Sequence, residues 1–390
     1  MGKMPNSRLM VIIPDRLSDL VEKGEITERY YNPGNLFDEV HIVMTNDDIV
    51  DLDLIQKTVG DAKLYIHNVQ GGNNLFIRSL GWQPAMMESW IQNGIKLARD
   101  ISPSLVRTHN NFKEGYLAKR IKDELSIPYI VSLHGVWDRD CSTVPRERLI
   151  KAFRTKLEKT SLKDADGVIA VYKPILRYAN EYGAKKVELI YNVVDGRDIN
   201  KKEDYNLSSP PRIITVNRQV KEKNPENIIK AIKNINCYYL IVGDGYYHEQ
   251  LKQVARENGC ENKVEFIKSI PNHQLCSMLK DFDIMVSHCD YWGISKTVIE
   301  ASLAGLPIII NTHPIEPIPD YEGDWLLQCD NSVEGYEQAI FYLLQNNNIR
   351  TSLGKKAYTH ACEFFDPVRM EEKIVQLYLN AMGVEEVKKL

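Results

Sequence analysis

Between residues 212 and 311 the sequence reads, in four regular blocks, RIITVNRQVKEKNPENIIKAI (212–232), YYLIVGDG (238–245), VEFIKSIPNHQLCSMLKDFDIMVS (264–287) and WGISKTVIEASLAGLPIIIN (292–311). In these blocks, short apolar runs typical of buried strands end at a turn or at the start of a helical pattern. Open α/β sheets bind ligands at such strand ends. The blocks therefore predict a parallel α/β sheet with its ligand site at the carboxyl ends of the strands.

The same alternation of strand and helix patterns fills the first half of the chain. Its apolar runs are LMVIIP, EVHIVM, KLYIHNV, SLVRTH, YIVSLH, GVIAVY and VELIYN. Runs without polar alternation are typical of parallel strands that helices cover on both faces. A polar stretch ending in Pro210 and Pro211 then separates the two series. We expect two Rossmann-like, doubly wound domains, 1–195 and 210–366, joined by a linker at 196–209 and facing each other across a cleft.

Length and composition restrict the class of protein. A chain of 390 residues exceeds one usual core, and 43% apolar with 26% charged residues is typical of a soluble globular protein. The net charge of −4 argues against a nucleic-acid partner. Seven cysteines without a CxxC pair favour reduced thiols over disulfides or structural zinc. No apolar run approaches the roughly 20 residues of a spanning helix, so we expect a cytoplasmic protein that at most touches a membrane peripherally.

Two cations follow the strand IITVN. Arg218 and Lys223 precede an Asn-Pro pair at 224–225 that suits the N-cap and first position of a helix. Cationic side chains beside a helix N-terminus are suited to a diphosphate. The alternative is a solvated loop in which Glu222 and Glu226 balance the positive charge.

The GDG turn at 243–245 permits close backbone approach, although such a turn is weak evidence alone. In the last block Ser295 can cap the helix KTVIEASLA and Gly305 can end it. Glu300 lies in the middle of that helix. It either forms an exposed pair with Lys296, four residues earlier, or accepts hydrogen bonds from the ribose hydroxyls of a nucleotide.

Together these blocks resemble the nucleotide-sugar-dependent retaining glycosyltransferases of the GT-B fold, called family 4 or glycosyl transferases group 1. The resemblance implies that Arg218 and Lys223 hold the donor diphosphate, that Glu300 binds the donor ribose, and that the backbone of 268–270 borders the nucleobase. It also places five further residues around the donor. They are Gly243, Ile270, Gly293, Ser295 and Lys296.

The first domain resembles the same family at two strand ends, SLVRTHN and IVSLHG. The resemblance places His134 near the transferred sugar and the acceptor, whereas His109 is better explained by a structural role. The helix expected at 367–390 is similar to the family's last helix, which packs back on the first domain. Residues 30–34, YYNPG, are either an acceptor loop or an ordinary turn.

The sequence departs from the family signature at one acidic position. Trp292 stands eight residues before Glu300, where the family has a glutamate that contacts the donor sugar, and Asp290 lies two residues upstream. This departure puts the identity of the sugar, and turnover itself, in question. A tryptophan could instead offer an apolar face to a sugar ring.

The resemblance implies a hexosyltransferase that uses a nucleoside-diphosphate sugar as donor and a glycan, a glycolipid or another glycoconjugate as acceptor. It implies neither a metal nor a further cofactor, with His134, Arg218 and Lys223 as the catalytic set. Two alternatives stay open: a GT-B epimerase or phosphorylase, and a non-catalytic nucleotide-sugar-binding scaffold.

A basic helical segment adds a possible membrane contact. Residues 139–163 hold eight basic and three acidic residues, giving 8 − 3 = +5. Such a helix can dock on anionic lipid, consistent with a lipid-linked acceptor, or it can be an ordinary solvated face.

Overall fold

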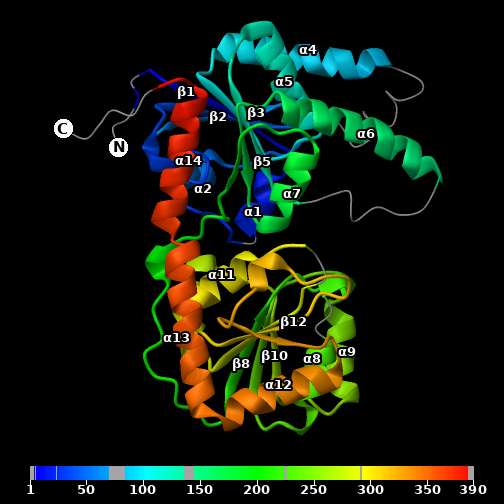
Figure 1. The fold of residues 1–390 in the computed structure, drawn as a ribbon, viewed down its shortest axis with the longest axis vertical. Helices are drawn as coiled ribbons and strands as arrows, with labels where there is room; N and C mark the ends of the chain where they lie inside the picture. Colours follow the sequence, from blue (N-terminus) through cyan, green and yellow to red (C-terminus); the bar gives the residue numbers. More distant parts are fainter. Residues whose placement is uncertain are drawn as a thin grey trace. The chain divides into compact units, whose positions relative to one another are not determined.

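The computed structural model describes residues 4, 6–22, 24–69, 84–135, 145–223, 226–289 and 292–384. The chain divides into two compact units (Figure 1). Unit 1 contains Met1–Val193 and Val368–Leu390, and unit 2 contains Val194–Pro367.

Unit 1 is built on a parallel sheet with the strand order β3-β2-β1-β4-β5-β6-β7. All seven strands coincide with the apolar runs that predicted them. They are β1 (Arg8–Ile13), β2 (Glu39–Met44), β3 (Lys63–Asn68), β4 (Leu105–Thr108), β5 (Tyr129–Leu133), β6 (Gly167–Ala170) and β7 (Val187–Leu189). The strand order reverses between β1 and β4, which pair directly, so the carboxyl ends of these two strands flank a topological switch point.

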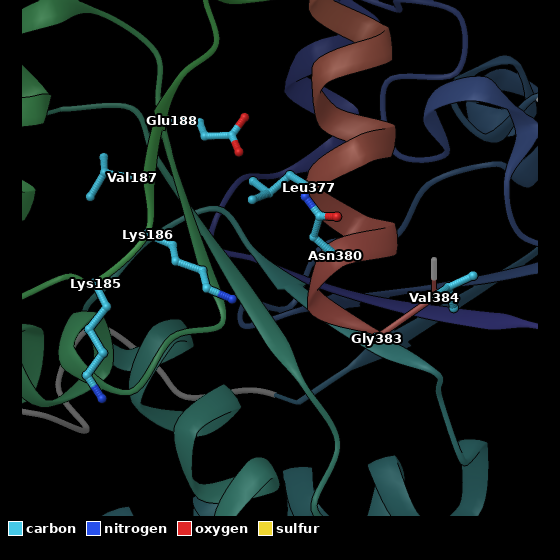
Figure 2. Close-up of a pocket in the computed structure, with 8 residues that line it drawn as sticks. All are labelled: Lys185, Lys186, Val187, Glu188, Leu377, Asn380, Gly383 and Val384. Atoms are coloured by element: carbon cyan, nitrogen blue, oxygen red, sulfur yellow. The ribbon is translucent and has the colours of Figure 1, made fainter. Parts of the chain in front are cut away.

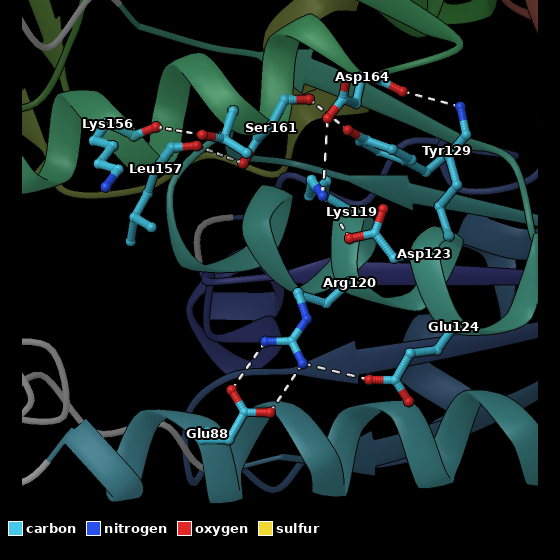
Figure 3. Close-up of polar contacts among 12 residues, drawn as sticks. Glu88, Lys119, Arg120, Asp123, Glu124, Tyr129, Lys156, Leu157, Ser161 and Asp164 are labelled. Atoms are coloured by element: carbon cyan, nitrogen blue, oxygen red, sulfur yellow. Dashed lines mark hydrogen bonds and ion pairs between the residues drawn. The ribbon is translucent and has the colours of Figure 1, made fainter.

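The helices of unit 1 cross between these strands. They are α1 (Leu17–Glu22), α2 (Leu52–Ile55), α4 (Pro84–Ile101), α5 (Lys113–Leu125), α6 (Pro145–Lys163), α7 (Lys173–Glu181) and α14 (Pro367–Ala381), with 3₁₀ turns η1 (Pro33–Asn35) and η2 (Gln56–Val59). Figure 3 shows how polar contacts join α4, α5, α6 and β5. Arg120 on α5 donates from both Nη atoms to Glu88 on α4, each at 2.9 Å, and this holds the pKa of Glu88 at about 2. Tyr129 on β5 donates to the carbonyl of Ser161 on α6.

The C-terminal helix α14 packs on unit 1. Its Tyr378 is fully buried, and its Leu377 lies against Gly167 of β6 so closely that a Cβ on that glycine would be 2.7 Å from Leu377 Cδ1. The part of the predicted helix at 385–390 lies outside the described residues.

Unit 2 repeats the architecture with a parallel six-stranded sheet of order β10-β9-β8-β11-β12-β13. Its strands are β8 (Arg212–Val216), β9 (Tyr238–Val242), β10 (Val264–Ile267), β11 (Ile284–Ser287), β12 (Ile308–Asn311) and β13 (Leu327–Cys329). The strand order reverses between β8 and β11. Two parallel, doubly wound sheets confirm the predicted fold class.

The helices of unit 2 are α8 (Glu226–Ala231), α9 (His248–Glu257), α10 (Asn272–Met278), α11 (Lys296–Leu303), α12 (Val333–Gln345) and α13 (Asn347–Phe364). The 3₁₀ turns are η4 (Gly196–Asp198), η5 (Lys221–Lys223), η6 (Ile232–Asn234), η7 (Leu279–Asp281) and η8 (Pro319–Tyr321). Among the helices of the described ranges, none is both long and apolar enough to span a bilayer.

The segment expected as a linker, 196–209, packs on unit 2. Lys202 donates its backbone N–H to the carbonyl of Ala304, and the Tyr205 hydroxyl donates to the carbonyl of Gly305. Arg350 donates from Nε and Nη2 to the Tyr205 carbonyl. The polar composition of residues 196–209 suggested a linker. In the structure, Tyr205 and these backbone groups attach the segment to unit 2.

Candidate functional site

The loop after β8 presents a cation at the switch point of unit 2. The Arg218 side chain is exposed and forms no hydrogen bond or ion pair with another described residue. Lys223 ends the turn η5, is partly exposed, and donates its backbone N–H to the Val220 carbonyl. The predicted cap and first position at 224–225 lie outside the described residues, and α8 begins at Glu226.

The GDG turn lies directly on this loop. Gly243 has φ +143°, and a Cβ there would be 1.8 Å from the carbonyl oxygen of Asn217. Gly245 has φ +157°, and its Cβ would be 2.2 Å from the carbonyl oxygen of Gln219. Both positions require glycine for conformation and for space. The turn is thus part of the same structure as the loop that carries Arg218.

The N-terminus of α11 faces the end of β8. Ser295 is the N-cap, as predicted, and its hydroxyl accepts from the backbone N–H of Val298 at 3.3 Å. Thr297 in the first turn donates to the carbonyl of Val216, the last residue of β8, at 3.2 Å. The unpaired N–H groups of a helix start carry partial positive charge, so the loop cation and the helix N-terminus lie in one region.

Glu300 is buried in the middle of α11, with 3% of its surface exposed. Its Oε1 accepts a hydrogen bond from Asn272 Nδ2 at 2.9 Å. The carboxylate is therefore buried, whereas the alternative of a pair with Lys296 assumed an exposed one. Asn272 begins α10, and no sequence signal indicated it as a partner.

The remaining predicted donor residues lie at neighbouring strand ends. Ile270 follows β10 and is half-buried, and Lys268 pairs with Asp244 of the GDG turn at 3.6 Å. Gly293 follows β11, and its carbonyl accepts from the Tyr321 hydroxyl at 3.2 Å. Lys296 opens α11. The structure thus brings together, at one edge of one sheet, the residues that the sequence assigned to the donor.

Trp292 is buried beside this edge. It is 8% exposed, and its ring lies 4.2 Å from that of His313, centroid to centroid. One side of the indole is thus occupied by a protein ring. Asp290, the nearest acidic residue upstream, lies outside the described residues.

Asn217 is a site feature that sequence reasoning missed. Neither atom of its side-chain amide is accessible to solvent or has a hydrogen-bond partner among the described residues. An unpaired buried amide costs about 1–3 kcal/mol. Such an arrangement is often retained at functional sites. In the sequence, the only feature that could have indicated Asn217 was its position directly before Arg218.

In unit 1, two histidines and two tyrosines gather at the carboxyl edge of the sheet. His109 follows β4 and is buried, and its ring centroid lies 5.2 Å from that of His134, which follows β5 and is exposed. The rings of Tyr30 and Tyr31 lie 5.5 and 5.4 Å from His109. The predicted acceptor loop and the predicted catalytic histidine are therefore neighbours within this unit.

The C-terminal helix fixes that loop. Glu371 of α14 accepts from the Gly34 backbone N–H at 2.7 Å and from Arg29 at 2.9 Å. Arg107, buried on β4, donates to the Tyr30 carbonyl at 3.2 Å and to the Tyr378 hydroxyl at 2.8 Å. We call this set of contacts the α14 clasp.

Two cavities lie away from these residues. One, of about 630 Å³, opens between the edge strand β7 and the end of α14 (Figure 2). Its lining includes Lys185, Lys186, Leu377 and Asn380. The other, of about 420 Å³, lies beside Trp325 and His360 in unit 2. In the described part of the chain, no three His, Cys, Asp or Glu side chains form a group that could hold a metal ion.

Comparison with known proteins matches two family models. "Glycosyl transferases group 1" matches residues 197–360, and "Glycosyltransferase Family 4" matches residues 38–197. An uncharacterized glycosyltransferase of Methanocaldococcus jannaschii is 24% identical over 290 residues, covering 71% of this chain and 76% of the relative. N-acetyl-alpha-D-glucosaminyl L-malate synthase of Bacillus anthracis is 23% identical, covering 67% and 69%.

The fold agrees with a solved structure of similar size. The structure of HepE from Anabaena in complex with UDP superposes with a TM-score of 0.72 at 14% identity, covering 95% of this chain and 98% of that one. The chain belongs to the GT-B glycosyltransferases of the family 4 and group 1 type. It is a glycosyltransferase with two Rossmann-like domains.

Proposed function

We propose that the protein is a retaining hexosyltransferase that moves a sugar from a nucleoside diphosphate to a glycan or a lipid-linked acceptor. The observation that carries the proposal is the guanidinium of Arg218, which has no partner among the described residues and follows β8 at the switch point of unit 2, close to the N-terminus of α11. HepE, which shares the fold, binds UDP, and this supports a nucleotide as the donor's carrier.

The proposed reaction loads negative charge on the diphosphate as the bond to the anomeric carbon breaks. Arg218 and Lys223, with the N–H groups that open α11, stabilise that charge as it develops, which lowers the barrier more than it tightens donor binding. The acceptor oxygen forms the new bond on the same face of the sugar, and its proton moves to the departing phosphate. Because side chains supply the positive charge, we propose that turnover is independent of metal.

Glu300 and His134 have supporting roles in this proposal. The buried carboxylate of Glu300, oriented by Asn272, binds the ribose hydroxyls, as acidic residues do in other dinucleotide folds. His134, in the aromatic cluster of unit 1, orients the acceptor or the transferred sugar. Of the two tyrosines beside His109, Tyr31 is buried, and the partly exposed ring of Tyr30 offers an apolar face to that acceptor.

A membrane contact belongs to the same proposal, because a lipid-linked acceptor lies at a bilayer surface. In the part of α6 whose side chains are described, Lys156, Lys159 and Lys163 are exposed, whereas Leu157 and Leu162 are buried. We propose that this basic face binds anionic lipid. Cosedimentation with vesicles of phosphatidylglycerol and phosphatidylcholine at low salt tests it, and a protein that stays in the supernatant would contradict it.

The second candidate is a nucleotide-sugar-binding scaffold without turnover. It is favoured by one observation, the buried Trp292 in place of the family's glutamate. Donor binding without sugar transfer across a broad acceptor panel would support the scaffold, and Trp292→Glu restoring transfer would support it further. Epimerisation of the donor in the absence of acceptor would instead indicate the epimerase alternative.

Titration calorimetry with ADP, CDP, GDP and UDP, followed by turnover of the matching sugar nucleotides, tests the proposal. Arg218→Ala and Lys223→Ala should each lower turnover about tenfold or more, because each removes a charge that stabilises the leaving group. Lys221→Ala, an exposed lysine of the same loop, is the matched control and should retain turnover. Unchanged kinetics in both site variants would remove these residues from the mechanism.

A further inference from the structure

Gln219 connects the two loops of the proposed donor site. It directly follows Arg218 and is fully buried. Its side-chain Nε2 donates to the Gly243 carbonyl at 2.5 Å, and its Oε1 lies 2.6 Å from His248 Nδ1. Since an amide oxygen only accepts, His248 carries a proton on Nδ1.

The backbone of Gln219 makes the same connection. Its N–H donates to the carbonyl of Asp244 at 2.9 Å, and its carbonyl accepts from the N–H of Tyr247 at 3.0 Å. Four hydrogen bonds of one residue therefore hold the loop after β8 against the segment 243–248. The missing side chain of Gly245 provides the room for this contact, because a Cβ would overlap the Gln219 carbonyl.

Arg218 is held on both sides by this arrangement. On its N-terminal side, Asn217 donates its backbone N–H to the Val242 carbonyl at 3.1 Å and touches Gly243. On its C-terminal side lies the anchored Gln219. The guanidinium has no hydrogen-bond or ion-pair partner among the described residues. The position of the Arg218 backbone therefore determines which ligand atoms the guanidinium can reach.

We propose that Gln219, with His248 behind it, is a positioning residue that fixes the Arg218 backbone so that the guanidinium meets the diphosphate. The inference rests on the proposed donor site and adds a specific requirement to it. When the backbone is fixed, the long Arg218 side chain has less conformational entropy to lose on binding. Small displacements of a binding group also reduce affinity strongly. Gln219 itself does not contact the ligand in this scheme.

The test is a double-mutant cycle on the affinity for the nucleoside diphosphate. Gln219→Met keeps the volume and removes the polar side-chain contacts. The wild type should bind at least one of ADP, CDP, GDP and UDP. We expect Gln219→Met to bind the same nucleotide about tenfold more weakly, because a less fixed Arg218 loses more conformational freedom on binding. In an Arg218→Ala background the same change should weaken binding no further, because a positioning residue acts through the side chain it positions.

A second variant keeps the test valid if Gln219→Met fails to fold. His248→Phe retains a ring against Phe266, whose centroid lies 5.7 Å away, and removes the Nδ1 donor. It should show a smaller loss of affinity that also disappears without Arg218. Gln338→Met, an exposed glutamine on α12, is the matched control and should bind like the wild type.

The outcomes separate the two levels of the proposal. Unchanged affinity in folded Gln219→Met, or an equal loss with and without Arg218, would overturn the positioning role and leave the donor site intact. A wild type that binds none of the four nucleoside diphosphates would instead overturn the donor site itself.

Discussion

At the scale of single residues, glycine determines whether the donor loops can form. Gly243 needs φ +143° and leaves no room for a Cβ beside the Asn217 carbonyl. The backbone atoms that a Cβ would meet belong to the loop that carries Arg218. Any side chain at residue 243 would therefore strain the loop that carries Arg218.

Gly243→Ala should lower the free energy of unfolding of unit 2 by about 3 kcal/mol or more, since it combines backbone strain with a steric clash. The matched control is Gly259→Ala. Gly259 has φ +65° but nothing within 4 Å of its Cβ position, so only the left-handed backbone should cost about 1 kcal/mol. Urea denaturation followed by circular dichroism measures both. Equal losses would show that the close approach at Gly243 is unimportant.

A histidine pair gives unit 1 a pH dependence. His41 on β2 places its Nδ1 3.0 Å from His67 Nε2 on β3. Burial, and then the neighbouring His67, lower the pKa of His41 to about 4, and burial also lowers the pKa of His67. Arg8 adds to the effect on His41, whereas Glu39 opposes it.

The sign of the effect follows from the lowered pKa. Between pH 6.5 and about 4 the unfolded chain binds a proton at residue 41 and the folded chain does not, so stability is lost as pH falls through this window. Each such histidine changes the free energy of unfolding by at most about 1.4 kcal/mol per pH unit. Between pH 7 and pH 4, the melting temperature of His41→Gln should therefore fall less than that of the wild type. His273→Gln, an exposed histidine on α10, is the control for removal of one imidazole. A wild-type slope retained in His41→Gln would contradict the assignment.

At the scale of elements, α14 organises a loop that is remote from it in sequence. The α14 clasp joins this helix and β4 to residues 29–34. The tyrosines of that loop border His109, whose ring lies beside His134. The C-terminal helix therefore determines the shape of the proposed acceptor region.

Glu371→Ala should destabilise unit 1 by about 1 kcal/mol, because it removes a charge-assisted bond to the Gly34 N–H and a partly exposed pair with Arg29. Hydrogen exchange of a peptide covering 29–37 should accelerate. Glu372→Ala is the control, since that neighbouring glutamate is exposed. Exchange that is equally slow in both variants would show that the loop does not depend on the clasp.

The elements themselves were largely predictable from the sequence. All seven strands of unit 1, the cap at Ser295 and the end of α11 at Gly305 follow from apolar runs and from local capping chemistry. The environment of Glu300 did not follow. Periodicity places it on a helix, but only packing against α10 decides that the carboxylate is buried beside Asn272.

At the scale of the whole molecule, one topology occurs twice. Both sheets place their first and fourth strands side by side, so each has a switch point where loops diverge to opposite faces. Arg218, the GDG turn and the N-terminus of α11 come together because β8, β9 and β11 are parallel neighbours on one sheet. In unit 1 the same rule collects His109 and His134.

The sequence by itself determined the fold class and most of the strands, since apolar patterns and capping residues act over a few positions and can be recognised locally. The family followed from the resemblance of its motifs, which the family models matched. Only the tertiary structure decided which polar groups meet: Gln219 with His248, Glu300 with Asn272, and Glu371 with the loop at residue 34. These partners are separated by 28 to 337 residues. They meet because burial of the sheets fixes their positions, and no local pattern encodes that.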